Sequence, residues 1–307
     1  MMKSINILIP FYNEQDSVKE LIELIDNVIS PLEYNFSFTL VDDGSNDETW
    51  SSIKKIEMKN KPIKKIKLSR NFGHQGAIFS GLESLNEDAV IIMDGDFQDN
   101  PIYIPELLKK WEEGNHLVLA KRTSRDEGYV RRMLIRIYFK LQNKFSEISI
   151  PENVGHFSLL DKKIVNVMNL FPESNKFLLG IRSYVGFKVA YVDVVKNKRL
   201  YGNPKMDIRK LLRLSSEGLI GFSTTPLSLI GVVGLIISIF SLGFSFYTLI
   251  MKVFFNIKVL NWDFGLTSIY FLSGVQLLAI SILGQYIAKI FNETKHRPQY
   301  IIEEISE

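Results

Sequence analysis

Two aspartates separated by one glycine are the first residues in the chain with an evident chemistry. Asp94 and Asp96 flank Gly95, which lets the backbone turn tightly and brings two carboxylates within reach of one cation. Mg²⁺ is typically held by one or two carboxylates together with substrate phosphates. The spacing therefore favours a site for a divalent cation and a diphosphate. Asp-Gly is also a common turn, so the pair taken alone leaves a purely structural role open.

Three further polar segments each follow an apolar run. They are Pro10–Glu14, Asp42–Ser45 and Arg70–Gln75. Each has a local alternative, because residues such as Ser45 and Asp47 commonly cap helices. Several acidic or amide-rich segments at one place are harder to explain as caps. Clustered carboxylates repel one another unless a cation or a donor-rich ligand lies among them.

Short apolar runs that alternate with amphipathic segments predict the elements that position these residues. Strands are expected near Ile5–Pro10, Phe36–Val41, Ile63–Leu68, Ala89–Met93 and His116–Ala120, with helices between them. Such a series implies an α/β domain with a mostly parallel sheet covered on both faces. Ligands of these sheets bind beyond the carboxyl ends of the strands. The four polar segments follow the first four strands, so we expect them to meet at one site.

Missing motifs narrow the chemistry. The chain has no Gly-x-x-x-x-Gly-Lys-Ser/Thr loop and no Gly-x-Gly-x-x-Gly after the first strand, so neither a P-loop NTPase nor a dinucleotide oxidoreductase is supported. Four histidines, none of them paired at metal-ligand spacing, and no cysteine argue against a zinc site. A net charge of +3 without a basic tract gives no reason to expect a nucleic-acid partner.

Charged residues are distributed unevenly along the chain. None of the 37 Lys and Arg or 34 Asp and Glu residues lies between Gly218 and Met251 or between Phe264 and Ala288. A helix that crosses a bilayer needs roughly 20 apolar residues. We therefore predict a hairpin of two transmembrane helices, with spans at Pro226–Met251 and Leu266–Ile290. Buried core helices are the alternative, but the rest of this region is too short to cover them.

Basic residues outside the hairpin outnumber those in its connecting loop. Lys205, Arg209, Lys210 and Arg213 precede it and Lys289, Lys295 and Arg297 follow the second span, against Lys252 and Lys258 in the loop. Cytoplasmic flanks carry the excess of basic residues, so the loop is expected to face outward and both termini to be cytoplasmic. The apolar run Ile5–Ile9 is too short for a signal peptide.

Two segments have the pattern of helices that lie in the membrane interface. In 129–145 and in 208–222, apolar residues form one stripe and basic residues lie elsewhere. A helix packed on the domain core is the open alternative for each.

The predicted organisation is a cytoplasmic catalytic domain over 1–204, an interfacial helix over 205–224, two transmembrane helices over 225–291 and a cytoplasmic tail over 292–307.

These motifs resemble those of inverting family 2 glycosyltransferases with the GT-A fold. Within that family they are similar to the polyprenyl-phosphate type, which includes bactoprenol glucosyl transferases and dolichol-phosphate mannose synthases. The resemblance covers nearly the whole chain and rests on Pro10–Glu14, Val41–Ser45 with Asp47 and Thr49, Leu68–Gln75, Asp94–Asp96 with Gln98 and Asp99, Asn153–Gly155 with Phe157, Arg199 with Gly202 and Lys205, and the hairpin that ends in Lys295–Pro298. It implies a membrane-bound homo-oligomer, a tetramer in relatives.

The resemblance also implies roles for individual residues. The uridine pocket is implied to be lined by Pro10, Tyr12, Glu14, Asp42 and Asp94, and the nucleotide sugar to be contacted as well by Asp43, Arg70 and Gln75. Asp42 is placed to accept a hydrogen bond from the uracil N–H. Mg²⁺ or Mn²⁺ on the diphosphate is implied to be held by Asp96, with Asp94 and Gln98 nearby.

Four cations are assigned to phosphate groups of the donor and of the lipid. They are Arg122, Arg136, Arg199 and Lys205. Arginine offers a bidentate fork to phosphate oxygens. Solvated surface charge is the alternative for each of them.

His156 departs from the family pattern. In bacterial relatives the position after the Asn-x-Gly turn is more often aspartate, the residue usually proposed as a base. A sugar hydroxyl acceptor needs such a base, whereas a phosphate monoester has its second pKa near 6 and is mostly ionised at pH 7. His156 is therefore tolerable as a phosphate ligand, as a base or as a packed residue of the turn. The candidate catalytic residues are Asp96, His156 and Arg122.

The expected activity is the inverting transfer of a hexose from a UDP-sugar to undecaprenyl phosphate at the cytoplasmic face of a bacterial membrane. Glucose is the favoured sugar, and N-acetylglucosamine, galactose and mannose fit the same motifs. A polysaccharide-elongating transferase is a second interpretation, but it needs a base and a pore that two spans cannot build. A scaffold without enzymatic activity is a third, and the intact Asp42, Asp94 and Asp96 speak against it.

Overall fold

The structure, a computed structural model, describes residues 2–123, 151–174, 176–195, 225–255 and 262–307. It divides into two compact units. The first comprises Met1–Phe139, Ile148–Asp207 and His296–Glu307, and the second Lys140–Glu147 and Ile208–Lys295. The predicted interfacial segments 129–145 and 208–222 lie outside the described residues.

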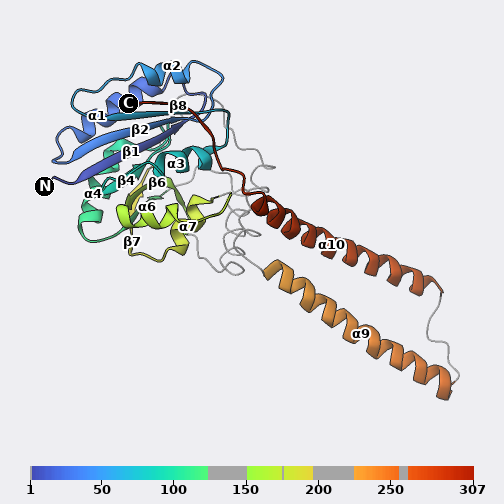
Figure 1. The fold of residues 1–307 in the computed structure, drawn as a ribbon. Coiled ribbons are helices and arrows are strands. Elements are labelled where there is room, and N and C mark those ends of the chain that lie inside the picture. Colours follow the sequence, from blue (N-terminus) through green and yellow to red (C-terminus); the bar gives the residue numbers. More distant parts are fainter. Residues whose placement is uncertain (1, 124–150, 175, 196–224, 256–261) are drawn as a thin grey trace. The chain divides into compact units, whose positions relative to one another are not determined.

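An eight-stranded sheet forms the centre of the first unit (Figure 1). Its order is β7-β5-β6-β4-β1-β2-β3-β8. The strands are β1 (Ser4–Phe11), β2 (Asn35–Asp42), β3 (Ile63–Leu68), β4 (Ala89–Ile92), β5 (Leu117–Arg122), β6 (Val154–Asp161), β7 (Val189–Val194) and β8 (Ile302–Ser306). The five predicted strands are confirmed, with small shifts at their ends.

The middle of the sheet is parallel. Strand β1 pairs in parallel with β2 and β4, and β2 pairs in parallel with β3. Strand β6 joins β4 and β5 as antiparallel neighbours, and β7 lies parallel to β5. Because β1 is covered on both faces, its sequence from Ile7 to Phe11 is continuously apolar and does not alternate.

Helices cover both faces of the sheet (Figure 1). They are α1 (Val18–Ile29), α2 (Thr49–Lys54), α3 (His74–Leu82), α4 (Ile104–Glu112), α6 (Lys162–Asn169) and α7 (Leu178–Tyr184), with a short 3₁₀ helix η1 (Pro101–Tyr103). Adjacent residues of β1 serve different cores: Ile7 packs with α1 and α4, and Leu8 packs with α3, α6 and α7. This three-layer arrangement leaves the carboxyl ends of the parallel strands open for loops.

The last strand comes from the segment that follows the second long helix. The sequence analysis treats 292–307 as a tail, whereas the structure pairs β8 antiparallel with the edge strand β3. The backbone N–H of Ser69 donates to the carbonyl of Ile301 at 2.9 Å. An ion pair between Lys54 and Glu304 at 2.7 Å adds a side-chain contact. The chain therefore returns to the sheet and covers an edge that would otherwise present unpaired backbone groups.

The second unit contains two long apolar helices, α9 (Thr225–Phe255) and α10 (Trp262–Thr294). Each includes a candidate membrane span, Leu227–Phe255 of 29 residues and Ser268–Thr294 of 27. Their apolar side chains are exposed within the chain, Phe240 to 76% and Phe254 to 77%. A water-soluble protein rarely exposes such a surface, so the two helices suit a lipid environment. The hairpin predicted from the charge pattern is confirmed as two apolar helices.

Removal of residues 302–307 is expected to destabilise the first unit, because it leaves the edge of β3 unpaired. We expect a loss of about 2 kcal/mol, which lowers the Tm of a domain of this size by about 4–8 °C. Thermal unfolding of the detergent-solubilised chain measures the change. As a control, Glu303→Gln removes only the exposed ion pair with Lys67, and such pairs contribute about 0–1 kcal/mol. An unchanged Tm in the truncated chain would contradict a structural role for β8.

Candidate active site

The loops after β1 and β2 are joined to each other by hydrogen bonds. Asp43 donates its backbone N–H to the carbonyl of Phe11 at 2.9 Å. Asn13 donates its backbone N–H to Ser45 Oγ at 2.9 Å, and Asn46 donates to Asn13 Oδ1 at 2.9 Å. Asn13 has a φ of 51°, a left-handed conformation that asparagine adopts more readily than most residues. The ends of the two strands thus form one fixed wall.

Asp42 is completely buried at the end of β2. Its Oδ1 accepts from the backbone N–H of Ser45 at 3.2 Å and from the Ser45 hydroxyl. Its Oδ2 is buried without a hydrogen-bond partner among the described residues. Burial raises the pKa of this carboxyl, and the hydrogen bonds from Ser45 act against that rise. A buried acceptor without a donor is costly, so this oxygen is suited to an N–H of a ligand.

Three of the other residues predicted for the uridine pocket, Pro10, Tyr12 and Glu14, belong to the end of β1 or the loop after it, and β1 pairs with the end of β2 that carries Asp42. Pro10 is buried at the end of β1, and Tyr12 and Glu14 in the following loop are half-buried. Glu14 donates its backbone N–H to Thr49 Oγ1 at 2.9 Å, which ties this loop to α2. The structure therefore brings Pro10, Tyr12, Glu14 and Asp42 to neighbouring strand ends, as the parallel sheet predicts.

Asp43 points toward the loop that precedes α3. Its Oδ1 accepts from the backbone N–H of Phe72 at 2.8 Å. Burial raises its pKa to about 6, although hydrogen bonds from Phe72 and Gly73 act in the other direction. Asp43 thus holds the Arg70–Gln75 loop against β2, and its predicted contact with the nucleotide sugar stays a prediction.

Two glycines allow these loops to approach each other. Gly44 has a φ of 63°, and a Cβ there would lie 2.2 Å from the carbonyl carbon of Arg70. A Cβ on Gly95 would lie 2.5 Å from the ring of Phe11. Only glycine fits at either place without moving the neighbouring strand end. The predicted role of Gly95 as the tight turn between two aspartates therefore has a steric basis.

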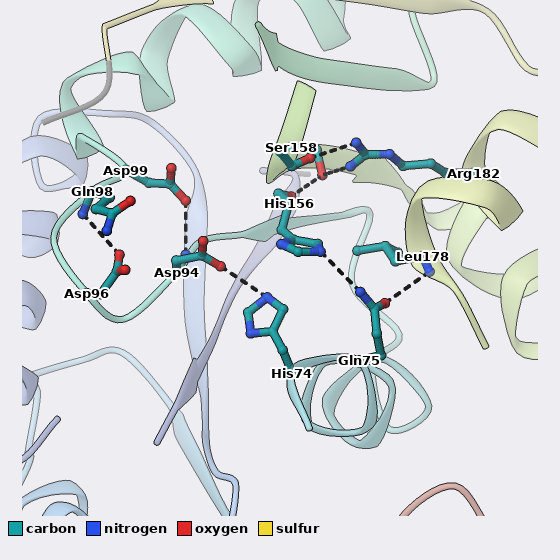
Figure 2. A network of polar contacts seen from close by, with 11 residues as sticks. His74, Gln75, Asp94, Asp96, Gln98, Asp99, His156, Ser158, Leu178 and Arg182 are labelled. Carbon is teal, nitrogen blue, oxygen red and sulfur yellow. Dashed lines mark hydrogen bonds and ion pairs between the residues drawn. The ribbon is translucent and has the colours of Figure 1, made fainter. Parts of the chain in front are cut away.

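Both aspartates of the Asp-Gly-Asp motif lie on one short turn after β4 (Figure 2). Asp94 donates its backbone N–H to Asp99 Oδ2 at 3.1 Å. Asp96 Oδ1 accepts from the backbone N–H of Gln98 at 3.2 Å. The three predicted metal ligands, Asp94, Asp96 and Gln98, are thus brought onto the same turn.

Two histidines lie beside Asp94. The Nε2 of His74 is 3.1 Å from Asp94 Oδ1, and the ring centroids of His74 and His156 are 4.4 Å apart. One ligand atom from each of the three residues lies within 4.8 Å of the others, an arrangement that can hold a metal ion. In the sequence no histidines stand at metal-ligand spacing, and His74 is not among the predicted site residues. Its place in the polar segment Arg70–Gln75, which leads from β3 into α3, is the signal that could have identified it.

Opposite pKa shifts distinguish the two histidines. Burial disfavours the charged form of His74, but the carboxylates of Asp94, Asp43 and Asp96 outweigh it and raise the pKa. Burial and the neighbouring His74 lower the pKa of His156 to about 3. A proton is therefore bound more readily by His74 than by His156, and His156 is neutral at pH 7. An efficient general base has a pKa near the working pH, so His156 is poorly suited to that role.

Gln75 lies between α7 and His156 (Figure 2). Its Oε1 accepts from the backbone N–H of Leu178 at 3.0 Å, and its Nε2 is 3.1 Å from His156 Nε2. The sequence analysis assigned Gln75 to the nucleotide sugar. The structure brings it to His156, and any contact with the donor stays a prediction.

The predicted cations have different surroundings. Arg122, at the end of β5, lines a small pocket with Gln98, Asp99 and Gly155, so its guanidinium lies on the side of the Asp-Gly-Asp turn. Arg70 is exposed and lies over the ring of Phe72 at 4.2 Å. Arg136, Arg199 and Lys205 lie outside the described residues.

Arg182 is a buried cation that the sequence analysis did not single out. It is 3% exposed on α7, and burial lowers its pKa to about 9. It donates to the carbonyl of Gly155 at 2.7 Å and to Ser158 Oγ at 3.2 Å. Arg182 therefore holds the first residues of β6, the strand that carries His156. The sequence analysis placed His156 in a turn, whereas the turn ends at Asn153 and His156 belongs to the strand.

Sequence comparison identifies the family. Residues 6–168 match the family described as Glycosyl transferase family 2. The chain belongs to this family. This family 2 glycosyltransferase is 36% identical over 300 residues to the bactoprenol glucosyl transferase of Shigella phage SfV. The aligned residues cover 97% of this chain and 98% of that protein. The chain is 34% identical over 302 residues to the prophage bactoprenol glucosyl transferase homolog of Escherichia coli K12, covering 98% and 99%.

Structural comparison agrees on the fold of this family 2 glycosyltransferase. A mannosyltransferase from Pyrobaculum calidifontis, solved in complex with GDP-Man and Mn²⁺, superposes with a TM-score of 0.50 at 14% identity, covering 72% of this chain and 63% of that chain. The GT-A fold and the similarity to polyprenyl-phosphate transferases expected from the motifs are confirmed. The chain is therefore a glycosyltransferase with the GT-A fold, and the roles of the individual site residues stay predictions.

The raised pKa of Asp43 predicts a stability difference that depends on pH. A carboxyl with a folded pKa of about 6 and an ordinary value of 3.8 binds its proton more tightly in the folded chain, so stability falls as pH rises between these values. The variant Asp43→Asn has no carboxyl at this position, so its stability does not fall in this pH range for this reason. Its advantage over the parent should grow from pH 4 to pH 6 and then level off, at about 2–3 kcal/mol.

Thermal unfolding of both chains between pH 4 and pH 7 measures that difference. Asp43→Ala, which also removes the acceptor for Phe72, should lie below Asp43→Asn at every pH. A gap between parent and Asp43→Asn that does not change with pH would contradict the raised pKa.

Proposed function

We propose that this glycosyltransferase transfers one hexose, most favourably glucose, from a UDP-sugar to undecaprenyl phosphate with inversion at the anomeric carbon. The observation that carries the proposal is the presence, in one chain, of a GT-A site at the strand ends and of two helices long enough to cross a bilayer. The names of the bactoprenol glucosyl transferases that it resembles along nearly its whole length support the lipid acceptor and the choice of glucose.

The donor base would lie at the wall formed by the ends of β1 and β2. The unpartnered Oδ2 of Asp42 supports this placement, because a buried carboxylate oxygen requires an N–H donor and uracil supplies one. Tyr12 and Glu14, half-buried beside it, complete the pocket. Fixed loops on both sides reduce the conformational entropy that is lost on binding.

Asp96 and Asp94, with Gln98 beside them, would hold Mg²⁺ or Mn²⁺. The donor set fits such an ion, because carboxylate oxygens on one turn suit both metals. The Mn²⁺ in the Pyrobaculum complex supports a divalent ion. When bound, the ion neutralises the charge that develops on the leaving diphosphate. Arg122 would add a fixed cation at the same end of the sheet.

The acceptor phosphate would attack without a protein base. A phosphate monoester is mostly ionised at pH 7, and the lowered pKa of His156 on β6 makes that residue a poor base. Arg136, Arg199 and Lys205 remain our proposed ligands for phosphate groups. The two long helices would keep the site at the depth of the lipid headgroups. This raises the effective concentration of the lipid phosphate at the site.

The product of the reaction distinguishes the proposed activity from its alternatives. Membranes that contain the chain, incubated with labelled UDP-glucose and undecaprenyl phosphate, should yield label that extracts into organic solvent. Asp42→Asn serves as a site control and should lower this signal. Label in a water-soluble polymer would support an elongating transferase, and label in neither fraction would support a scaffold. Parallel incubations with UDP-N-acetylglucosamine, UDP-galactose and GDP-mannose would identify the donor.

Replacement of the two candidate catalytic side chains should have unequal effects. Asp96→Ala is expected to reduce turnover by about 100-fold or more, since it removes charge stabilisation of the leaving group. His156→Ala should reduce it by only about tenfold, the effect of one or two lost hydrogen bonds. Lys59→Ala, at an exposed position in the first unit, which we call the head, is the unaffected control. Equal and nearly complete losses would rule out transfer without a base.

The proposed topology places the head and both termini in the cytoplasm. Because the chain has no cysteine, single cysteines report accessibility without background. An impermeant maleimide applied to intact cells should label Lys258→Cys in the connecting loop and should spare Lys59→Cys in the head. Labelling of both positions only after lysis, or the reverse pattern, would contradict the orientation that the basic flanks predict.

A further inference from the structure

The hydrogen bonds around Gln75 define the direction in which each group donates. A backbone N–H can only donate, so the Gln75 atom that faces Leu178 is the carbonyl oxygen Oε1. The other end of the side chain, the amide Nε2, therefore faces His156 Nε2 at 3.1 Å. An amide nitrogen has hydrogens and no available lone pair. It follows that Gln75 donates and His156 Nε2 accepts.

A neutral imidazole has one nitrogen that donates and one that accepts. Once Nε2 accepts from Gln75, the ring proton belongs on Nδ1. We infer that Gln75 fixes His156 as the neutral tautomer protonated at Nδ1, so that this residue presents an N–H donor to the site and not a lone pair. Gln75 is then a positioning residue that acts through His156.

The same helix that directs Gln75 also fixes the backbone around His156. Arg182 on α7 donates to the carbonyl of Gly155 at 2.7 Å. It also donates to Ser158 Oγ, which in turn donates to the carbonyl of His156 at 2.7 Å. The residues on both sides of His156 are therefore held from α7. The ring has little freedom to turn and exchange the places of its two nitrogens.

The tautomer determines what His156 can do. A base and a metal ligand both need a lone pair on the ring nitrogen that faces the site, whereas Nδ1–H can only donate. An N–H suits an oxygen acceptor, either the carboxylate of Asp94 nearby or a phosphate oxygen of a bound substrate. The phosphate part of this role rests on the proposed function, and the tautomer itself does not. In this tautomer His156 does not act as a metal ligand, whereas Asp94 and Asp96 can.

Nuclear magnetic resonance of the full chain, labelled with ¹⁵N and ¹³C in histidine, tests the tautomer directly. The chain has four histidines, and His156→Asn identifies the signals of this one. We expect shifts of a neutral ring protonated at Nδ1. In Gln75→Glu the carboxylate can only accept from Leu178 and from the ring, so the proton should move to Nε2. A parent ring protonated at Nε2, or a Gln75→Glu ring that keeps the proton on Nδ1, would overturn the inference.

If Gln75→Glu does not fold, the spectrum of the parent chain still decides. Turnover gives an independent test with two matched variants. The amide N–H of His156→Asn takes the place of Nδ1–H, whereas His156→Gln reaches the place of Nε2. The Asn variant should be faster by about five- to tenfold, the value of one hydrogen bond. Equal rates or the reverse order would overturn the donor role. A parent chain inactive with every donor would refute the proposed function and leave the spectrum as the test of the tautomer.

Discussion

The concentration of carboxylates at one edge of a buried sheet is the constraint on which the rest of the site depends. Asp42 and Asp43 are almost completely removed from water, and burial disfavours their charged forms. The chain compensates with nearby donors: the Ser45 hydroxyl donates to Asp42 and the Phe72 backbone N–H donates to Asp43. At the same edge the His74 ring lies against Asp94. Compensation is incomplete at Asp42 Oδ2. A ligand that supplies an N–H and a cation completes the network that the fold leaves open.

Steric constraints follow from the same concentration. Carboxylates can share one ligand only if the loops that carry them lie close together, and this closeness excludes a Cβ at Gly44 and at Gly95. The turn after β4 also holds Phe97 at a φ of 61°, a conformation that costs free energy in a bulky residue. Burial of the Phe97 side chain in the core helps to offset this cost. Local strain, glycine placement and electrostatics thus belong to one arrangement.

The sequence was sufficient to predict the features that depend on local pattern. Buried parallel strands read as apolar runs, and parallel strands bring their carboxyl ends together, so the convergence of Asp42, Asp94 and Asp96 could be predicted. Contacts that depend on distant pairing could not. Gln75 and Leu178 are 103 positions apart, and no periodicity relates them. Strand β8 has few apolar residues, shows no alternation of apolar and polar residues, and is largely exposed. Only its pairing with β3 identifies it as a strand.

His156 shows how the acceptor determines which side chain is tolerable. A carboxylate at this position of β6 would add a negative charge beside Asp94, and an anionic acceptor would bring another. Like charges at a partly buried site raise the free energy of the bound state. A neutral ring that donates from Nδ1 removes one of these charges and offers a hydrogen bond to the oxygen that arrives. A sugar hydroxyl would lose its proton acceptor in this exchange, whereas a phosphate that is already ionised loses nothing. A neutral donor at this position is therefore compatible with the proposed lipid phosphate acceptor, which needs no protein base.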